Sequence, residues 1–224
     1  MSTTVVTGAN RGIGLEFARQ LSARGGAVVG TARRPTEAEA LRALGVRVEP
    51  LDVADDASVA AFAKRLAGDP VDALINNAGI GESGPRIAAL PIAGAERALQ
   101  VNALGALRVT QALLPNLRHG ARRLVVGLSS GLSSLERNRE GGWAAYRVSK
   151  AALNMIFRTL AAELAAEGFT CVVIDPGWVR TDMGGRGAPT PPEASVAAML
   201  KTLDRLTPAD SGRFLSARGK DAAW

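Results

Sequence analysis

The only tyrosine of the chain, Tyr146, stands four residues before Lys150, one of four lysines. Residues at positions i and i+4 of a helix share a face, so the phenol and the ammonium can approach each other. A phenol has an unperturbed pKa of about 10, and a nearby ammonium favours the phenolate and lowers that value. The pair is therefore suited to donate or accept a proton near neutral pH.

Few other side chains offer nucleophilic or metal-binding chemistry, because the sequence holds one His and one Cys. A zinc site of Cys/His type needs three or four ligands and a disulfide needs two cysteines, so we predict neither. His119 stands beside Gly120 at a predicted helix end, a common capping position. Cys171 lies in an apolar run and is expected to be an inert core thiol. Neither residue is assigned a catalytic role.

A glycine-rich segment, TGANRGIG at 7–14, follows the first apolar run and precedes a helical pattern. Backbone N–H groups at a helix N-terminus form an anion site, and glycines let a phosphate approach the backbone closely. The spacing G-x-x-x-G-x-G differs from the G-x-G-x-x-G dinucleotide fingerprint, and a plain strand-to-helix turn is the alternative. We predict that the segment binds a dinucleotide through Gly8, Asn10, Arg11, Gly12, Ile13 and Gly14.

The residues after the second apolar run indicate which dinucleotide fits. An acidic residue at this point favours NAD, whereas a basic residue accommodates the 2′-phosphate of NADP. This chain has Arg33 and Arg34 and no acid there, and Arg11 adds a guanidinium from the glycine turn. Arginine binds phosphate in bidentate geometry, so we predict NADP(H) as the cofactor. The alternative is that Arg33 and Arg34 are solvated loop charges.

Short apolar runs alternate with helical patterns along the chain. Strands are expected at 3–7, 27–31, 46–51, 71–75, 123–128, 170–174 and 212–215. Helices are expected at 15–24, 36–44, 55–66, 92–102, 103–117, 143–167 and 193–206. This alternation, with continuously apolar strands, indicates a parallel sheet covered on both faces. We predict an α/β fold of Rossmann type, a doubly wound parallel sheet of about seven strands.

Length, charge and hydropathy limit the class of protein. A chain of 224 residues is expected to form a single domain, 1–224, that holds both the NADP site and the catalytic site. The net charge is +6, but no basic run carries interleaved aromatics, so nucleic acid is not an expected partner. No apolar run approaches the ~18 residues of a membrane span. The first residues show no signal-peptide pattern, so a cytoplasmic location is expected.

Taken in chain order, these motifs resemble the short-chain dehydrogenase/reductase family. The matching segments are Thr7-Gly8-x-x-x-Gly12-x-Gly14, Asn76-Asn77-Ala78-Gly79, Asn102, Ser130, Tyr146-x-x-x-Lys150, and Asp175-Pro176-Gly177 with Thr181. They extend over nearly the whole chain. Within the family, segments 146–155 and 176–185 and the terminal Trp224 are similar to the C-factor, Sniffer and carbonyl reductase branch.

The resemblance implies reduction of an aldehyde or ketone to an alcohol by NADPH, or the reverse reaction. It implies that Tyr146 donates the proton, that Ser130 hydrogen-bonds the carbonyl oxygen, and that Lys150 binds the nicotinamide ribose and lowers the tyrosine pKa. Asn102 would hold a water molecule that connects Lys150 to solvent. The strand end selects Ser130 as the catalytic serine, whereas the spacing common in the family selects Ser133; we favour Ser130.

The resemblance also implies contacts with the rest of the cofactor. Asp52, followed by Val53, would contact the adenine amine. The residues expected beside the adenosine ribose and the sheet are Asn76, Ala78 and Gly79. The residues expected against the nicotinamide are Pro176, Gly177, Val179 and Thr181. A short Gly/Pro-rich lid at about 183–192 predicts a shallow, open substrate pocket walled by Trp143, Trp178 and Met183, although core packing is the alternative for both tryptophans.

Two expectations concern partners. The helix after Tyr146 is apolar enough to cover the sheet with one face and a second copy with another, and the corresponding helices pair in the family, so a homodimer or homotetramer is expected. The similarity to C-factor keeps a second function open, that of an NADP(H)-binding signalling or regulatory protein with incidental turnover. The complete set of Asn102, Ser130, Tyr146 and Lys150 favours the enzyme, because a binding module needs no acid positioned by an ammonium.

Overall fold

The computed structural model describes residues 2–81 and 86–224. Within these residues seven parallel strands form one sheet in the order β3-β2-β1-β4-β5-β6-β7. The strands are β1 (Thr3–Val6), β2 (Ala27–Ala32), β3 (Arg47–Pro50), β4 (Ala73–Asn76), β5 (Leu124–Leu128), β6 (Thr170–Asp175) and β7 (Phe214–Ser216). The α-helices are α1 (Gly12–Ala23), α2 (Glu39–Arg42), α3 (Asp56–Arg65), α4 (Ile92–Leu99), α5 (Gly105–His119), α6 (Ala144–Glu163) and α7 (Pro192–Leu203). The prediction of a doubly wound parallel sheet is confirmed.

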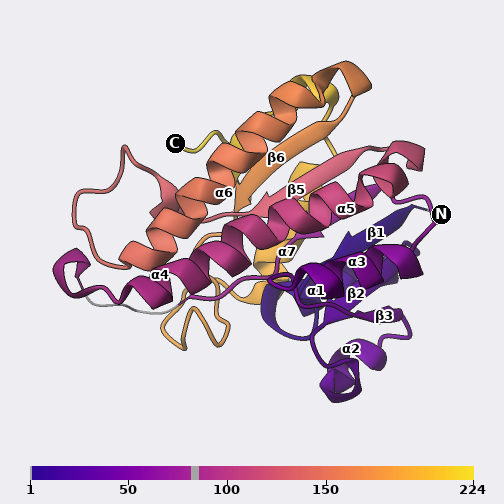
Figure 1. The fold of residues 1–224 in the computed structure, drawn as a ribbon, viewed down its shortest axis with the longest axis horizontal. Helices are drawn as coiled ribbons and strands as arrows, with labels where there is room; N and C mark the ends of the chain where they lie inside the picture. The colour runs from indigo at the N-terminus through magenta and orange to yellow at the C-terminus, as the bar shows by residue number, and fades with distance from the viewer. Residues whose placement is uncertain (1, 82–85) are drawn as a thin grey trace.

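Helices cover both faces of the sheet, as the apolar strands require (Figure 1). On one face α3, α5 and α6 bury Phe62, Leu113 and Phe157. On the other face α1, α2 and α7 bury Phe17, Leu41 and Met199. Successive strand residues point to opposite faces, so Val172 and Val173 of β6 enter different cores. Each strand therefore contributes to two hydrophobic layers.

The strand order reverses between β1 and β4, and this reversal decides where a ligand can bind. From β1 the chain crosses to β2 and β3 on one side, whereas β4 to β7 follow on the other side. In open α/β sheets the carboxyl ends of the strands form a crevice at such a switch point. The glycine turn leaves β1 at this crevice, and segment 77–81 leaves β4 beside it.

The predicted helices differ from the observed ones in two places. The segment predicted as a helix at 36–44 forms a 3₁₀ turn, Pro35–Glu37, followed by the four-residue helix α2. Predictions 92–102 and 103–117 form one continuous helical path, in which a π-helical turn, Gln100–Leu104, joins α4 to α5. Turns of this type interrupt α-helices frequently at functional sites, and this one carries Asn102.

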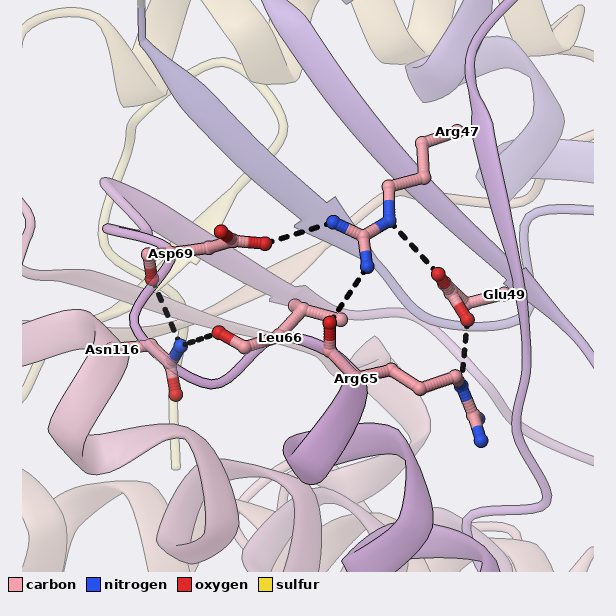
Figure 2. A network of polar contacts seen from close by, with 6 residues as sticks. All are labelled: Arg47, Glu49, Arg65, Leu66, Asp69 and Asn116. Carbon is pink, nitrogen blue, oxygen red and sulfur yellow. Dashed lines mark hydrogen bonds and ion pairs between the residues drawn. The ribbon is translucent and has the colours of Figure 1, made fainter.

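The edge strand β3 is fastened to the end of α3 by a network of charged side chains (Figure 2). Glu49 accepts hydrogen bonds from Arg47 and Arg65 at 2.8 and 2.7 Å, and Arg47 also pairs with Asp69 at 2.8 Å. Asn116 of α5 donates to the backbone carbonyl of Asp69 at 2.9 Å. The network holds in place the strand whose following residues, 51–53, reach the crevice.

Candidate active site

A cleft of about 700 Å³ lies at the carboxyl ends of the central strands. It gathers residues from the glycine turn, from the ends of β2, β3, β4 and β6, and from α6. The predicted residues that line it are Gly8, Asn10, Arg11, Gly12, Ile13, Arg33, Asp52, Val53, Ala78, Gly79, Tyr146, Lys150, Pro176, Thr181 and Met183. Segments far apart in the sequence thus meet around one elongated space.

The glycine turn fits closely against the segment that follows β4. Gly8 has φ +63°, and a Cβ there would lie 2.9 Å from the Cα of Ala78. A Cβ on Gly14 would lie 2.4 Å from the Nδ2 atom of Asn77, whose amide donates to the carbonyls of Thr7 and Gly8 at 2.8 and 3.0 Å. These contacts hold the turn as a backbone cradle at the N-terminus of α1, and such a cradle fits a pyrophosphate.

The arginines around the outer part of the cleft differ in their partners. Arg34 donates to both carboxylate oxygens of Glu37 at 2.8 and 3.0 Å. Arg11 pairs with Asp182 at 2.7 Å, but both side chains are well exposed, so this ion pair is weak and can exchange. Arg33 has no ion-pair partner among the residues described here. The free guanidinium of Arg33 beside Arg11 fits the 2′-phosphate of NADP better than the bare ribose of NAD.

Tyr146 lines the cleft together with Lys150, and burial raises the pKa of Tyr146 to about 12. A side-chain hydrogen bond with Ser130 acts against this rise, and the negative charge of Asp175 adds to it. Burial sets the net direction of this shift, and the lowering of the tyrosine pKa expected from Lys150 stays a prediction. The Lys150 Nζ atom lies 5.7 Å from the ring centroid and donates to the carbonyl of Leu128. The phenol therefore stays protonated at neutral pH, as a proton donor must.

The two candidate serines have different surroundings. Ser133 is 2% exposed, its hydroxyl donates to the carbonyl of Ser130 at 2.6 Å, and it accepts from the amide of Asn154 at 2.8 Å. The hydroxyl of Ser130, by contrast, accepts from the backbone N–H of Leu132 at 3.2 Å and also acts on the phenol of Tyr146. The surroundings of Ser133 are those of a buried structural hydroxyl, whereas Ser130 contacts the phenol.

Asn102 is buried beside Lys150 and is fully engaged. Its Oδ1 accepts from the N–H of Ile80 at 2.7 Å, and its Nδ2 donates to the carbonyl of Ile80 at 2.8 Å and to the Ser149 hydroxyl at 2.9 Å. A Cβ on Gly79 would lie 3.2 Å from the Asn102 Oδ1 and 3.6 Å from the Lys150 Nζ. The asparagine therefore fixes the segment after β4 next to the ammonium, and its role in holding water stays a prediction.

Four of the predicted cofactor residues do not line the cleft. Gly14 packs beneath the turn, and Val179 is buried at 4% exposure. Gly177 lies in a turn with φ +79°. Asn76 points away toward α5, where its amide donates to the Thr110 hydroxyl at 3.1 Å. The neighbouring Asn77, by contrast, does line the cleft.

The three predicted pocket walls have different surroundings. Met183 lines the cleft and packs on Gly81, where a Cβ would lie 2.8 Å from its Sδ. Trp143 meets Tyr146 edge to face with ring centroids 6.3 Å apart. Trp178 is 60% exposed, and its indole N–H donates to the carbonyl of Gly184 at 2.8 Å. Core packing therefore does not account for either tryptophan, since Trp143 is 37% exposed as well.

Sequence reasoning assigned no site role to several residues that line the cleft: Asn77, Ile80, Arg97, Gln100, Ser129 and Asp182. Arg97 and Gln100 precede Asn102 on the same helical path, so their spacing was a usable signal. Asp182 reaches Arg11 from the other end of the chain, and nothing in the local sequence indicates that contact.

Within residues 2–81 and 86–224, His, Cys, Asp and Glu side chains form no group that could hold a metal ion, and no helix is long and apolar enough to cross a membrane.

Comparison with known proteins agrees with this geometry. C-signal of Myxococcus xanthus is 47% identical over 164 residues, which cover 73% of this chain and 99% of that protein. The structure of carbonyl reductase Sniffer of D. melanogaster superposes with a TM-score of 0.95 at 29% identity, covering 100% of this chain and 99% of that one. NADPH-bound carbonyl reductase from chicken fatty liver gives 0.93 at 35% identity, with the same coverage.

The family model described as short chain dehydrogenase matches residues 2–190. That span contains the glycine turn, Ser130, Tyr146, Lys150 and the Asp-Pro-Gly segment. The chain belongs to the short-chain dehydrogenase/reductase family of oxidoreductases.

Proposed function

We propose that this protein is an NADPH-dependent carbonyl reductase, which reduces an aldehyde or ketone to an alcohol and also catalyses the reverse oxidation. The observation that carries the proposal is the placement of Tyr146 and Lys150 in one cleft with Arg33, with Ser130 next to the phenol. The similarity to a carbonyl reductase described with NADPH bound supports the same cofactor here.

Different residues of the cleft would bind different parts of NADP(H). The backbone of the glycine turn would bind the pyrophosphate, and Arg33 with Arg11 would bind the 2′-phosphate. Asp52 would accept from the adenine amine, while Pro176 and Thr181 would pack against the nicotinamide. When bound, the cofactor supplies the hydride, and the protein supplies orientation and proton transfer.

Proton transfer falls to Tyr146. The hydroxyls of Ser130 and Tyr146 would both donate to the carbonyl oxygen of the substrate, and the Tyr146 proton moves to that oxygen as negative charge develops there. The high pKa of Tyr146, about 12, keeps the phenol protonated before that moment. The Lys150 ammonium donates one hydrogen bond to the carbonyl of Leu128 and has two more hydrogens that can donate to the ribose. Its charge would stabilise the phenolate that forms when Tyr146 gives up its proton.

Cofactor and substrate sites share one domain, 1–224, in this proposal, and the protein forms a homodimer or homotetramer. Leu153 and Phe157 of α6 face the sheet, whereas Val148 and Met155 are 48% and 66% exposed on the same helix. These two side chains lie seven residues apart, so they offer an apolar stripe to a second copy. Light scattering during size-exclusion chromatography tests the assembly, and a monomer for the wild type would contradict it.

The decisive experiment is an NADPH-oxidation screen of the purified protein against aldehydes, ketones and quinones, with NADH in parallel. Turnover of at least one carbonyl with NADPH, and its loss in the Tyr146→Phe variant that still binds NADPH, is the expected result. Turnover that survives Tyr146→Phe contradicts the mechanism, and a preference for NADH contradicts the role of Arg33.

A second candidate function rests on the 47% identity to C-signal. In it the chain binds NADP(H) as a signalling or regulatory protein and turnover is incidental. NADPH binding without turnover of any carbonyl in the screen would favour this function. Intact contacts among Ser130, Tyr146 and Lys150 favour the enzyme.

A further inference from the structure

An acidic side chain that the mechanism does not use, Asp175, lies beside the reacting groups. It is the last residue of β6, which pairs in parallel with β5 so that Ile174 lies opposite Leu128. The ladder continues one bond further, with the N–H of Ser129 donating to the carbonyl of Ile174 at 2.8 Å. The carboxyl ends of the two strands therefore bring Asp175 next to the Ser129–Ser130 segment.

The two oxygens of the Asp175 carboxylate have different surroundings. Oδ1 accepts from the backbone N–H of Gly177 at 2.9 Å, within the Asp-Pro-Gly turn. Oδ2 lies against Gly131, the residue after Ser130, where an added Cβ would be 3.2 Å from it. One oxygen is thus held by the turn, and the other faces the backbone that carries the serine. The pKa of Tyr146 is raised in part by this negative charge, which places the phenol within its electrostatic reach.

The carboxylate is half-buried and is not neutralised by a neighbour. Among the residues that the structure describes, no Lys, Arg or His nitrogen lies within ion-pair distance of Asp175. The two cations of α6 in this region are directed at backbone carbonyls: Lys150 donates to Leu128, and Arg147 donates to Leu132. The Lys150 ammonium keeps its own charge on the β5 side, and Asp175 places an unpaired carboxylate beside Gly131 on the β6 side, next to the serine and the tyrosine.

We propose that Asp175 determines substrate charge specificity, so that the enzyme accepts neutral or cationic carbonyl compounds and discriminates against those with a carboxylate near the reacting carbonyl. The inference rests on the proposed carbonyl reductase function and names its substrate class. Repulsion between two like charges about 6 Å apart, at an effective dielectric constant of about 40, would lower kcat/KM for an anionic substrate roughly tenfold. For a cationic substrate at the same distance, attraction would raise kcat/KM by a similar factor. An N–H or O–H group of a neutral substrate can donate to Oδ2 of Asp175.

The test compares three benzaldehydes that carry a meta substituent: a carboxylate, its methyl ester and a trimethylammonium group. For each we measure kcat/KM with saturating NADPH in the wild type and in Asp175→Asn. Asparagine keeps an oxygen acceptor for the N–H of Gly177, and Asp175→Ser, a second variant, removes the charge with a smaller side chain. Glu163→Gln removes one negative charge from the exposed end of α6 and serves as the matched control.

Comparing each substrate between the two proteins cancels its intrinsic reactivity. We expect Asp175→Asn to raise the carboxylate-to-ester ratio of kcat/KM about tenfold and to lower the cation-to-ester ratio by a similar factor, while Glu163→Gln leaves both ratios unchanged. Unchanged ratios in both Asp175 variants, or equal shifts in Glu163→Gln, would overturn the proposal.

The proposed function can fail separately from this inference. A wild type that does not reduce even the neutral ester contradicts carbonyl reduction of this class. Charge selection is then measured without turnover, by calorimetric binding of the three aldehydes to the NADPH complexes of Tyr146→Phe and of Tyr146→Phe with Asp175→Asn. A preference for the cation that disappears with Asp175 supports the charge selection, and equal affinities for the three compounds in both complexes contradict it.

Discussion

The ammonium of Lys150 donates a hydrogen bond of 2.6 Å to the backbone carbonyl of Leu128, at the end of β5. The lysine is 4% exposed, and burial lowers its pKa to about 8. Its charge therefore costs stability at neutral pH, because a buried ammonium has lost its hydration and has only a carbonyl in return. The fold therefore holds a cation in the cleft at a cost in stability.

Replacement by methionine makes this cost measurable. Lys150→Met should raise the free energy of unfolding at pH 7 by about 1 kcal/mol, since relief of about 3 kcal/mol of desolvation outweighs a lost charged hydrogen bond worth about 2. The unfolded chain keeps the lysine proton up to pH 10.5, and the folded chain releases it near pH 8. Wild-type stability therefore gains with pH across that window, and the advantage of the variant should shrink. Urea denaturation of both proteins at pH 7 and pH 10, without cofactor, measures the stability gain and its decrease with pH. The kcat/KM of Lys150→Met should fall at least ~100-fold.

Ser130 and Ser133 should separate catalysis from stability. Ser130→Ala should lower kcat about 100-fold, because it removes a donor to the carbonyl oxygen, and should lower the free energy of unfolding by at most about 1 kcal/mol, the cost of the lost cap on Leu132. Ser133→Ala should leave kcat within a few fold but lower the free energy of unfolding by about 1–2 kcal/mol, because Asn154 loses its buried partner. Kinetics and thermal melts on both variants decide the assignment, and the opposite pattern would identify Ser133 as the catalytic serine.

Arg33 should control the choice between NADPH and NADH. Arg33→Gln should weaken NADPH binding by about tenfold to 100-fold and leave NADH binding unchanged, because only NADPH carries the 2′-phosphate. Fluorescence titration with both cofactors measures this. Arg42→Gln, which removes an exposed arginine outside the cleft, controls for net charge. An equal loss for NADPH in both variants would show that charge alone, and not the Arg33 contact, is responsible.

Arg147 holds the segment between the serine and the tyrosine. Its guanidinium donates to the carbonyls of Leu132, Gly141 and Gly142 at 3.2, 3.2 and 3.0 Å. Arg147→Met should loosen this segment and the edge-to-face contact of Trp143 with Tyr146, so KM for the carbonyl should rise about tenfold while NADPH affinity stays unchanged. Hydrogen exchange of 131–143 should become faster in the same variant. Unchanged exchange together with unchanged KM would exclude a positioning role.

Periodic and local features of the chain were readable from the sequence. The parallel sheet followed from apolar strands that alternate with helices, and the cofactor turn followed from glycines between a strand and a helix. Tyr146 and Lys150 are linked by helical spacing alone, so their shared face needed no tertiary information. The break between α4 and α5 was placed correctly at Asn102, but its π-helical form was not, because no local propensity distinguishes that turn.

Contacts between distant segments needed the folded chain. Whether a serine reaches the phenol depends on how loop 131–142 folds back, and spacing therefore left Ser130 and Ser133 open. The net direction of the tyrosine pKa shift depends on burial and on Asp175 from another strand, so helical spacing by itself could not give it. The sequence by itself determined the sheet, the glycine turn and the pairing of Tyr146 with Lys150 on one helix, because these depend on neighbours along the chain. Only the tertiary structure decided the electrostatics of the site, because charge and desolvation act through space.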